Sequence, residues 1–352
     1  MKNRNDYDFN IGIICPSEIA TRRFLPALVK SDFFSFKGIA AANASEWFGE
    51  SLSEVSEIVI KQTIDREVAI AKAISREYGC EFFGSYQEII EAPSIDAVYI
   101  PLPPALHFKW AAMALRNGKH VFVEKPATTA LVATDALIIL AQEKNLALHE
   151  NYMFTFHNQL NEISQVVKSG KLGDIRLYRL SFGFPRRDKS DFRYSKALGG
   201  GALLDCGGYT LKYAKMLLGQ SACIVSAVLN HSSEFNVDLY GAATLVNDIG
   251  QTLQLSFGMD NSYKCELEIW GSKGSLVTGR ILTAPPDFKP TYEITSEAGR
   301  EIRELPADDS FHKSLEFFEE CINNAETRVH AYEMIRNQAA LVEEFQSKAL
   351  LY

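Results

Sequence analysis

The sequence predicts an α/β protein in which a doubly wound parallel sheet is followed by an α+β domain with a large, mostly antiparallel open sheet. Residues 1–150 alternate short apolar runs with helical patterns, which is typical of a parallel sheet. After residue 151, strand patterns follow one another with long gaps and no regular helix between them. A chain of 352 residues also favours two domains over one core. We therefore expect one domain at 1–150 and a second at 151–352.

Strand and helix patterns alternate regularly through the first domain. Pro101, Pro103 and Pro104 stop its most apolar strand, because proline lacks the N–H that a strand ladder needs. Gly118 stops the helix that follows. The predicted strands are Phe9–Ile14, Lys37–Ala42, Ile95–Ile100, Val121–Glu124 and Leu146–Glu150, and the predicted helices are Thr21–Lys30, a long stretch within Glu46–Tyr78, Leu106–Asn117 and Thr129–Lys144.

The second domain opens with one helical pattern and closes with two. Between them lie runs rich in β-branched and aromatic residues, which favour strands. The predicted strands are Ile175–Phe184, Cys223–Leu229, Asp238–Val246, Gln251–Gly258 and Tyr263–Trp270, and the predicted helices are Gln159–Ser169, Phe311–Asn324 and Tyr332–Leu350.

Composition narrows the range of functions. The chain carries 44 acidic and 36 basic residues, a net charge of −8, which argues against a nucleic-acid or membrane-surface partner. No apolar run reaches about 18 residues, and Met1 to Asn10 is polar, so we expect neither a membrane span nor an export signal. The six cysteines form no CxxC pair, which favours reduced thiols, a cytoplasmic location and no zinc site.

The turn after the first strand is where a parallel sheet would bind a pyrophosphate, at a glycine-rich loop that opens a helix. Here the loop reads Cys15-Pro16-Ser17-Glu18-Ile19-Ala20. Only Ala20 fits the G-x-G-x-x-G/A pattern, so this turn taken alone favours an ordinary strand-to-helix connection. Cys and Ser are nevertheless small, and the Ser17 hydroxyl can donate to a phosphate.

The second strand normally ends in an acid when the ribose 2′-OH of NAD is bound. In this sequence Ala41, Ala42 and Asn43 stand there, and the first acid is Glu46. That weakly favours NADP, but no basic residue follows closely to hold a 2′-phosphate. The choice between NAD and NADP stays open at this point.

Glu124-Lys125-Pro126 follows a buried strand, so Lys125 is expected at the ligand edge of the sheet. Pro126 restricts Lys125 to extended geometry. A lysine beside an acid and a cationic cofactor can exchange a proton with a substrate hydroxyl. For an isolated tripeptide, a surface lysine at a strand end is the favoured interpretation.

A glycine-rich cluster runs from Gly199 to Tyr209. Its glycines permit a tight turn into a helix, on which Asp205 and Tyr209 would share a face. A carboxylate and a phenol on one face can bind a polyol and assist proton movement. The alternative is a helix start that Asp205 caps and against which Tyr209 packs.

Two further groups of polar residues are candidates for binding sites. Arg186, Arg187 and Arg193 precede the glycines and could bind a phosphate or carboxylate of a substrate, although a solvated basic loop is favoured. The histidines at 149, 157 and 231 have no metal-ligand spacing, so we expect no metal site.

Taken together, the motifs resemble those of the glucose-fructose oxidoreductase / inositol dehydrogenase / MocA family (Gfo/Idh/MocA). Their order and spacing cover nearly the whole chain, which makes the resemblance specific. The matching segments are Ile11–Ile14 with Ile19-Ala20, Asp96–Pro101 with His107, Gly118–Pro126, Glu150–Phe154, Gly170–Ile175, Gly199–Tyr209 and Trp270–Gly274.

The resemblance implies a Rossmann domain, a C-terminal sheet that serves as a homodimer or tetramer interface, and hydride transfer between NAD(P) and a sugar or polyol carbon. It implies that Lys125 transfers the proton, that Asp205 orients the substrate and that Tyr209 assists. The residues expected to bind cofactor are Cys15, Pro16, Ser17, Glu18, Ile19, Asn43, Pro101, His107, Glu124 and Lys125, and those expected to bind substrate are Lys125, Tyr152, Arg193, Asp205 and Tyr209.

This sequence departs from the family pattern at the two early glycines, at Thr155, where relatives often have Arg, and by about twenty extra residues between Glu46 and Ala71. We expect an NAD(P)-dependent oxidoreductase acting on a sugar, a sugar derivative or a nucleotide sugar. One alternative is a non-catalytic binding or regulatory protein, although drift would not spare Lys125, Asp205 and Tyr209 together. Another is an enzyme that keeps NADP(H) bound and recycles it between two substrates.

Overall fold

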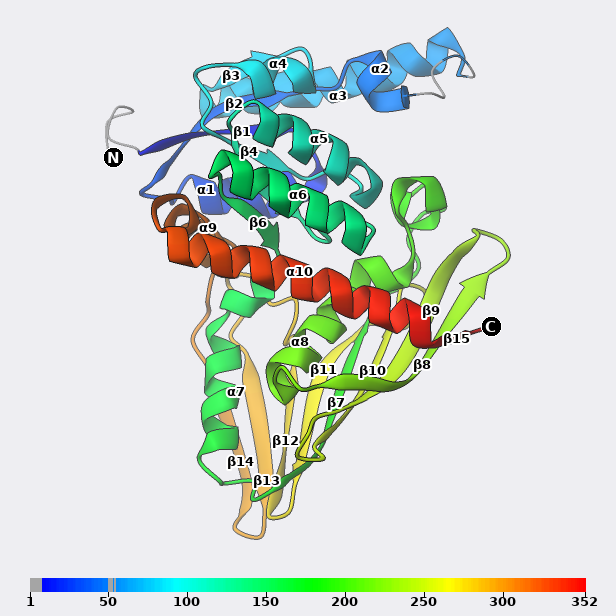
Figure 1. Cartoon of the computed structure of the whole chain (residues 1–352). Helices are drawn as coiled ribbons and strands as arrows, with labels where there is room; N and C mark the ends of the chain where they lie inside the picture. The colour runs from blue at the N-terminus through cyan, green and yellow to red at the C-terminus, as the bar shows by residue number, and fades with distance from the viewer. Residues whose placement is uncertain (1–7, 50–52, 54) are drawn as a thin grey trace. The chain divides into compact units, whose positions relative to one another are not determined.

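A computed structural model describes residues 8–49, 53 and 55–352. The polar start at Met1–Tyr7 and part of the segment predicted within Glu46–Tyr78 lie outside these residues. The chain divides into two compact units (Figure 1). The first contains the chain up to Thr128, Val132–Asn151 and Ser314–Ile335, and the second contains Thr129–Leu131, Tyr152–Lys313 and Arg336–Tyr352.

The first unit is built on a six-stranded parallel sheet with strand order β3-β2-β1-β4-β5-β6. This confirms the predicted doubly wound sheet, because β1 lies at its centre and the order runs outward on both sides. The pattern did not predict β3, whose three residues at the sheet edge are too few to show a period. The strands are β1 Phe9–Ile14, β2 Phe34–Ala40, β3 Glu81–Phe83, β4 Ala97–Ile100, β5 His120–Glu124 and β6 Leu148–Asn151.

Helices follow these strands. Two of them differ from the prediction, and a third, Tyr86–Glu91, was not predicted. The predicted helix Thr21–Lys30 is a π-helical turn at Ala20–Phe24 joined to the short α1 at Leu25–Leu28. The long pattern within Glu46–Tyr78 is divided into α2 and α3. The remaining helices that begin before residue 152 are α2 Ala44–Phe48, α3 Glu57–Tyr78, α4 Tyr86–Glu91, α5 Pro104–Arg116 and α6 Leu131–Lys144.

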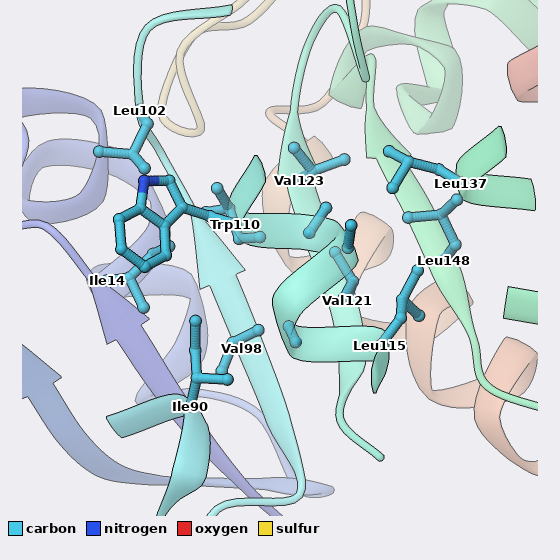
Figure 2. Close-up of a cluster of buried hydrophobic side chains, with 14 of the residues drawn as sticks. Ile14, Ile90, Val98, Leu102, Trp110, Leu115, Val121, Val123, Leu137 and Leu148 are labelled. Atoms are coloured by element: carbon cyan, nitrogen blue, oxygen red, sulfur yellow. The ribbon is translucent and has the colours of Figure 1, made fainter. Parts of the chain in front are cut away.

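The core of the first unit lies between the sheet and its helices (Figure 2). Val98, Val121 and Val123 are fully buried on β4 and β5, and Trp110 and Leu115 of α5 pack over them. Burying side chains of this size contributes about 1.5–3 kcal/mol each. The core therefore fixes β4 and β5. Pro101 follows the carboxyl end of β4, and Glu124 and Lys125 lie at the carboxyl end of β5.

The second unit contains a nine-stranded mixed sheet with strand order β14-β13-β12-β11-β7-β10-β9-β8-β15. Only β7–β10 and β8–β15 pair in parallel, which confirms the mostly antiparallel prediction. The hairpin strands β12 to β14 and the short β15 were not predicted. The strands are β7 Ile175–Gly183, β8 Cys223–Ser232, β9 Val237–Val246, β10 Thr252–Gly258, β11 Lys264–Gly271, β12 Gly274–Gly279, β13 Thr291–Ser296, β14 Gly299–Glu304 and β15 Ala349–Leu351.

The strands of this sheet alternate between buried and exposed side chains, as a sheet with one covered face requires. On β10, for example, Leu253 and Leu255 are buried whereas Gln254 and Ser256 are exposed. The helices that complete the chain are α7 Asn158–Lys168, α8 Gly208–Leu218, α9 Ser310–Asn323 and α10 Ala325–Lys348.

Candidate active site

The turn after β1 keeps the backbone of a glycine loop although its glycines are absent. Cys15 has a φ of 108°, a conformation that glycine adopts freely and other residues rarely do. Its N–H donates to the Ala40 carbonyl at 3.2 Å, which ties the loop to the end of β2. The Cys15 thiol is half-buried, and burial raises its pKa, so the thiol is a packing group and not a nucleophile.

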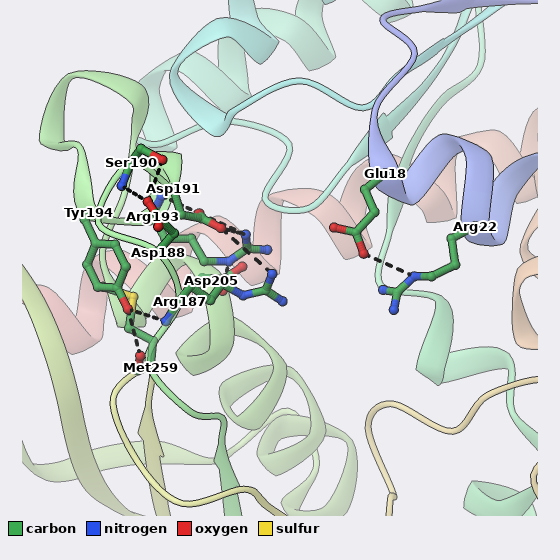
Figure 3. A network of polar contacts seen from close by, with 10 residues as sticks. All are labelled: Glu18, Arg22, Arg187, Asp188, Ser190, Asp191, Arg193, Tyr194, Asp205 and Met259. Atoms are coloured by element: carbon green, nitrogen blue, oxygen red, sulfur yellow. Dashed lines mark hydrogen bonds and ion pairs between the residues drawn. The ribbon is translucent and has the colours of Figure 1, made fainter. Parts of the chain in front are cut away.

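Ser17 caps the helical turn that follows. Its Oγ accepts a hydrogen bond from the Ala20 N–H at 3.3 Å, and its carbonyl accepts one from the Thr21 N–H at 3.1 Å. Accepting this bond leaves the hydroxyl its own proton, which it can donate in turn to a phosphate oxygen. Glu18 is exposed and pairs with Arg22 at 3.6 Å, which offsets its charge (Figure 3). The turn thus fits a pyrophosphate, even though Pro16 supplies no N–H.

Replacing Ser17 with glycine is expected to leave the fold intact and cofactor binding no weaker. Glycine suits this turn, and exchanging a capping Ser for Gly costs only a few tenths of a kcal/mol. Thermal unfolding and titration with reduced nicotinamide cofactor measure the two effects. A large loss of affinity would show instead that the serine hydroxyl is a phosphate ligand.

A buried carboxyl group lies between this loop and the end of β2. Glu67 of α3 is 5% exposed, and its Oε1 accepts hydrogen bonds from the Ala42 N–H at 3.2 Å and the Tyr86 hydroxyl at 2.8 Å. Burial raises the pKa of Glu67 to about 7, against these hydrogen bonds, which lower it. Sequence reasoning missed Glu67, because it shares a helix with many exposed charges.

The raised pKa of Glu67 predicts a pH dependence of stability. Its folded pKa lies above the ordinary value, so the contribution is fully present below about pH 4.5 and is lost as the pH rises through 7. Glu67→Gln should therefore lose less stability than the unmodified chain between pH 5 and pH 8. Denaturant unfolding across that range measures the difference, and parallel curves for the two proteins would contradict it.

Glu124 ends β5 and is held by groups on both neighbouring strands. Its Oε1 accepts hydrogen bonds from the Tyr99 hydroxyl at 2.8 Å and from the Asn151 side-chain amide at 2.7 Å. Burial raises the pKa of Glu124, whereas these two bonds and the charge of Lys125 lower it. The side chain that precedes Lys125 is therefore fixed in place, and with it the direction in which the chain leaves the strand.

The hydrogen bonds of Asn151 continue into α9. Its Oδ1 accepts from the Ser314 hydroxyl at 2.9 Å, and that hydroxyl lies 2.8 Å from His149 Nε2. Because Ser314 donates its only hydroxyl proton to Asn151, its oxygen must accept the hydrogen bond from His149. We therefore assign the proton of the His149 ring to Nε2. This buried series from His149 to Glu124 was missed in the sequence, because Ser314 lies more than 160 residues away along the chain.

His107 supports the residue after Lys125. It is fully buried, and its two ring nitrogens lie 2.7 Å from the carbonyl oxygens of Pro126 and Leu102. Burial lowers the pKa of His107 to about 4, which the two carbonyls oppose. His107 thus holds the Lys125-Pro126 turn, and the expectation that it also lines the nicotinamide stays a prediction.

In the second unit, Asp205 lies in a π-helical turn at Leu203–Gly207 and not in the regular helix that was expected. Turns of this kind occur often at functional sites. Asp205 Oδ2 accepts a hydrogen bond from Arg193 Nε at 2.6 Å, and Arg193 Nη1 contacts Asp191 at 3.2 Å (Figure 3). The expected solvated loop is therefore wrong for Arg193, which is 20% exposed and anchors Asp205.

Arg193 carries its charge between two carboxylates. Burial opposes the charged form, but Asp205 and Asp191 outweigh it and raise the pKa of Arg193. Arg186 and Arg187 are more exposed and pair with Glu234 and Asp191. Each of these three arginines therefore has a carboxylate partner.

Tyr209 lies just inside α8, in an aromatic cluster of the second unit. It is 7% exposed, and its ring centroid lies 5.2 Å from that of Tyr152 and 5.4 Å from that of Phe182. A Cβ at Gly208 would come within 2.2 Å of the Tyr152 hydroxyl, so this position requires glycine. Lys125 belongs to the first unit and Asp205 and Tyr209 to the second, and their joint action on one substrate stays a prediction.

Within residues 8–49, 53 and 55–352, no group of three or more His, Cys, Asp or Glu side chains could hold a metal ion. No helix in the same part of the chain is long and apolar enough to cross a membrane.

The parallel sheet, the glycine-like loop after β1 and the lysine at the end of β5 together define the class of dinucleotide-dependent oxidoreductases. Comparison with known proteins gives the family. Residues 10–152 match the model of the oxidoreductase family with an NAD-binding Rossmann fold, and residues 160–277 match the GFO/IDH/MocA C-terminal domain. The chain therefore belongs to the GFO/IDH/MocA family of oxidoreductases.

Relatives match over the whole chain. The dTDP-3,4-didehydro-2,6-dideoxy-alpha-D-glucose 3-reductase of Actinomadura kijaniata is 35% identical over 98% of this chain and 97% of its own length. An enzyme of the same name from Streptomyces violaceoruber is 36% identical over 90% and 85%. The structure of KijD10, a 3-ketoreductase from Actinomadura kijaniata in complex with NADP and TDP-benzene, matches with a TM-score of 0.87 and 34% identity, over 97% of this chain and 98% of that one.

These findings confirm the resemblance seen in the sequence. The chain is an NAD(P)-dependent oxidoreductase that transfers a hydride between a nicotinamide and a hydroxyl-bearing carbon of a sugar, a sugar derivative or a nucleotide sugar. The family match and the relatives therefore support an enzyme and not the alternative of a non-catalytic binding or regulatory protein.

Proposed function

We propose that the enzyme is a nucleotide-sugar ketoreductase, which reduces a keto group on a hexose linked to a nucleoside diphosphate. The observation that carries the proposal is the match over nearly the full length of both chains to reductases of dTDP-linked keto sugars. Lys125 at the carboxyl end of β5 and the anchored Asp205 support it, since they supply a proton donor and a hydroxyl acceptor.

In this proposal a bound nicotinamide dinucleotide supplies the hydride. The backbone of the turn after β1, at Cys15 and Ser17, would hold its pyrophosphate. Pro101 directly follows β4 and Glu124 ends β5, at the same edge of the sheet. Lys125 gives its proton to the substrate oxygen during reduction and takes it back in the reverse direction. Asp205, oriented by Arg193, accepts a hydrogen bond from a sugar hydroxyl. Tyr152 and Tyr209 form the aromatic surface beside it.

The substrate class is tested with purified enzyme, a reduced cofactor and paired substrates. A dTDP-linked keto-deoxyhexose should cause loss of absorbance at the nicotinamide band, whereas the same sugar without the nucleotide should react much more slowly. Equal rates with free and nucleotide-linked sugars would contradict the proposed class. Faster turnover of simple polyols would point to a polyol dehydrogenase.

We further propose that the protein is a homodimer or tetramer that associates through the nine-stranded sheet. Large apolar side chains are exposed on the strands of this sheet, on the face opposite the buried residues: Tyr240, Trp270 and Val277 are 49%, 54% and 46% exposed. Such patches mark interaction surfaces. Trp270→Glu should shift the mass measured by light scattering to that of a monomer, and an unchanged mass would exclude this surface.

We also propose a cytoplasmic location. All six cysteines are free thiols, as expected in a reducing compartment. Fractionation of cells that express the full chain tests this, and recovery from the periplasm or medium would contradict it.

A further inference from the structure

The helix that carries Asp205 begins at a residue that cannot cap it. The chain is helical from Ala202 to Leu218, and the first turn is closed by the Asp205 N–H, which donates to the Gly201 carbonyl at 3.2 Å. Gly201 therefore stands where a side chain normally accepts an N–H of the first turn, and glycine has no side chain to do so. Its φ of 116° is the reason for a glycine at this position.

Asp238 of β9 supplies the missing cap. Its Oδ2 accepts a hydrogen bond from the Leu203 N–H at 2.6 Å, which is a group that an N-cap side chain usually takes. Its Oδ1 lies against the backbone of Gly201, since a Cβ there would come within 2.3 Å of it. Burial raises the pKa of Asp238, whereas the N–H groups of Leu203 and Ala202 lower it. A carboxyl group thus lies at the positive end of the helix, where negative charge is stabilising.

Asp238 belongs to a strand that is held on both sides. β9 lies between β8 and β10 in the nine-stranded sheet, and Asp238 pairs with His231 of β8. The carbonyl of the next residue, Leu239, accepts the Met259 N–H at 2.9 Å. Interior strands are among the last parts of a fold to open, so the capping carboxyl group is held in place.

Arg193 is joined to the same turn through the glycines. The Gly201 N–H donates to the Arg193 carbonyl at 2.9 Å, and a Cβ at Gly200 would come within 2.3 Å of that carbonyl oxygen. Arg193 Nε in turn donates to the Asp205 carboxylate at 2.6 Å (Figure 3). Asp205 is therefore fixed twice, by Arg193 at its side chain and by the capped turn at its backbone.

We propose that Asp238 is a positioning residue for Asp205, and that it acts by capping the π-helical turn and not by contact with the substrate. This rests on the proposed function, in which Asp205 accepts a hydrogen bond from a sugar hydroxyl. Without the cap, an N–H group of the first turn loses its acceptor and the turn frays. The Asp205 carboxylate then moves relative to the sugar, and small displacements of this kind lower turnover strongly.

The test compares turnover and thermal unfolding of Asp238→Ala and Asp238→Asn in the full chain, with a dTDP-linked keto-deoxyhexose as substrate. Asp238→Ala should lower kcat about tenfold, which is less than the loss in Asp205→Ala, because the carboxylate is displaced and not removed. Asn is as good a helix cap as Asp, so Asp238→Asn should keep turnover within about threefold of the unmodified chain. The cofactor Kd should be unchanged in both variants.

Asp308→Ala is the matched control. Asp308 Oδ2 accepts the Asn158 N–H at 2.7 Å at the start of α7, so it also caps a helix of the second unit from a distant segment. Both alanine variants should lower the melting temperature by a few degrees. Only Asp238→Ala should also lower turnover. An equal loss of turnover in Asp308→Ala would assign the effect to general destabilisation and contradict the inference.

A double-mutant cycle separates positioning from stability. If Asp238 acts through Asp205, then Asp238→Ala should cause no further loss of turnover in the Asp205→Ala background, while it still lowers the melting temperature. A further tenfold loss of turnover in that background, roughly the loss expected from Asp238→Ala alone, would show that Asp238 affects the reaction by another route.

The other outcomes separate this inference from the proposed function. Normal turnover of folded Asp238→Ala, beside a large loss in Asp205→Ala, overturns the inference and leaves the proposed function intact. A loss in folded Asp238→Asn as large as that in Asp205→Ala shows that the cap is not what matters, and the inference fails. Normal turnover of Asp205→Ala, or no turnover of the dTDP-linked sugar by the unmodified chain, overturns the proposed function and this inference with it.

Discussion

Replacing Lys125 with alanine is expected to lower turnover by about two to four orders of magnitude, which is the usual loss on removing a general acid or base. Lys125 follows directly on Glu124, whose carboxyl group is fixed by Tyr99 and Asn151, and precedes Pro126, whose carbonyl is bonded to His107. The loss should therefore appear in the chemical step and not in folding.

The measurement separates turnover from binding. Steady-state kinetics of Lys125→Ala and Lys125→Met, with the cofactor affinity of each variant, should show a lower kcat and a cofactor Kd changed only a few-fold. Lys144→Ala serves as the control, because Lys144 is an exposed lysine at the end of α6 and should turn over normally. Near-normal turnover of both Lys125 variants would remove this residue from the mechanism.

Replacing Asp205 with alanine is expected to have the second largest effect. It leaves Arg193, whose side chain is 20% exposed, with Asp191 as its remaining carboxylate. Losing a hydrogen bond to a charged group costs about 1.5–3 kcal/mol of unfolding free energy, and the remaining pair with Asp191 keeps the loss within that range. Turnover should fall about 100-fold as well, because a displaced substrate loses its alignment with the reacting groups.

A double-mutant cycle with Arg193→Met assigns the loss to the pair. If the two residues act together, the double variant should be little worse than Asp205→Ala alone. The matched control is Arg186→Met, which breaks the exposed ion pair with Glu234 at 3.0 Å and should leave the unfolding free energy almost unchanged. Fully additive losses at Asp205 and Arg193 would contradict the proposed positioning of Asp205 by Arg193.

The sequence predicts much of the fold because periodicity and strand ends are local properties. The apolar run that ends at Ile100 and the proline cluster after it place β4 correctly, and Val121 to Glu124 place β5 within one residue. Elements that are short or irregular escape this reasoning. Glu81–Phe83 is too brief for a period to appear, and a π-helical turn at Leu203–Gly207 has no sequence signature that separates it from an α-helix.

The candidate site divides in the same way. Lys125 and Asp205 could be singled out as candidates from their neighbours along the chain, and so could the turn after β1, although its glycines are missing. Glu67, Ser314 and the pairing of Arg193 with Asp205 could not. Each of them acts on a residue that is distant in sequence or on another element.

The sequence alone determined that this is a two-part α/β oxidoreductase, and it predicts which lysine carries the proton. Those conclusions follow from hydrophobic period, from proline and glycine chemistry and from the position of residues at strand ends, all of which act over a few neighbouring residues. Only the tertiary structure decided that a carboxyl group from α3 reaches the end of β2 and that a serine of α9 completes the hydrogen bonds behind Glu124. Burial and hydrogen bonding between distant segments are made by the folded chain and leave no trace in local pattern.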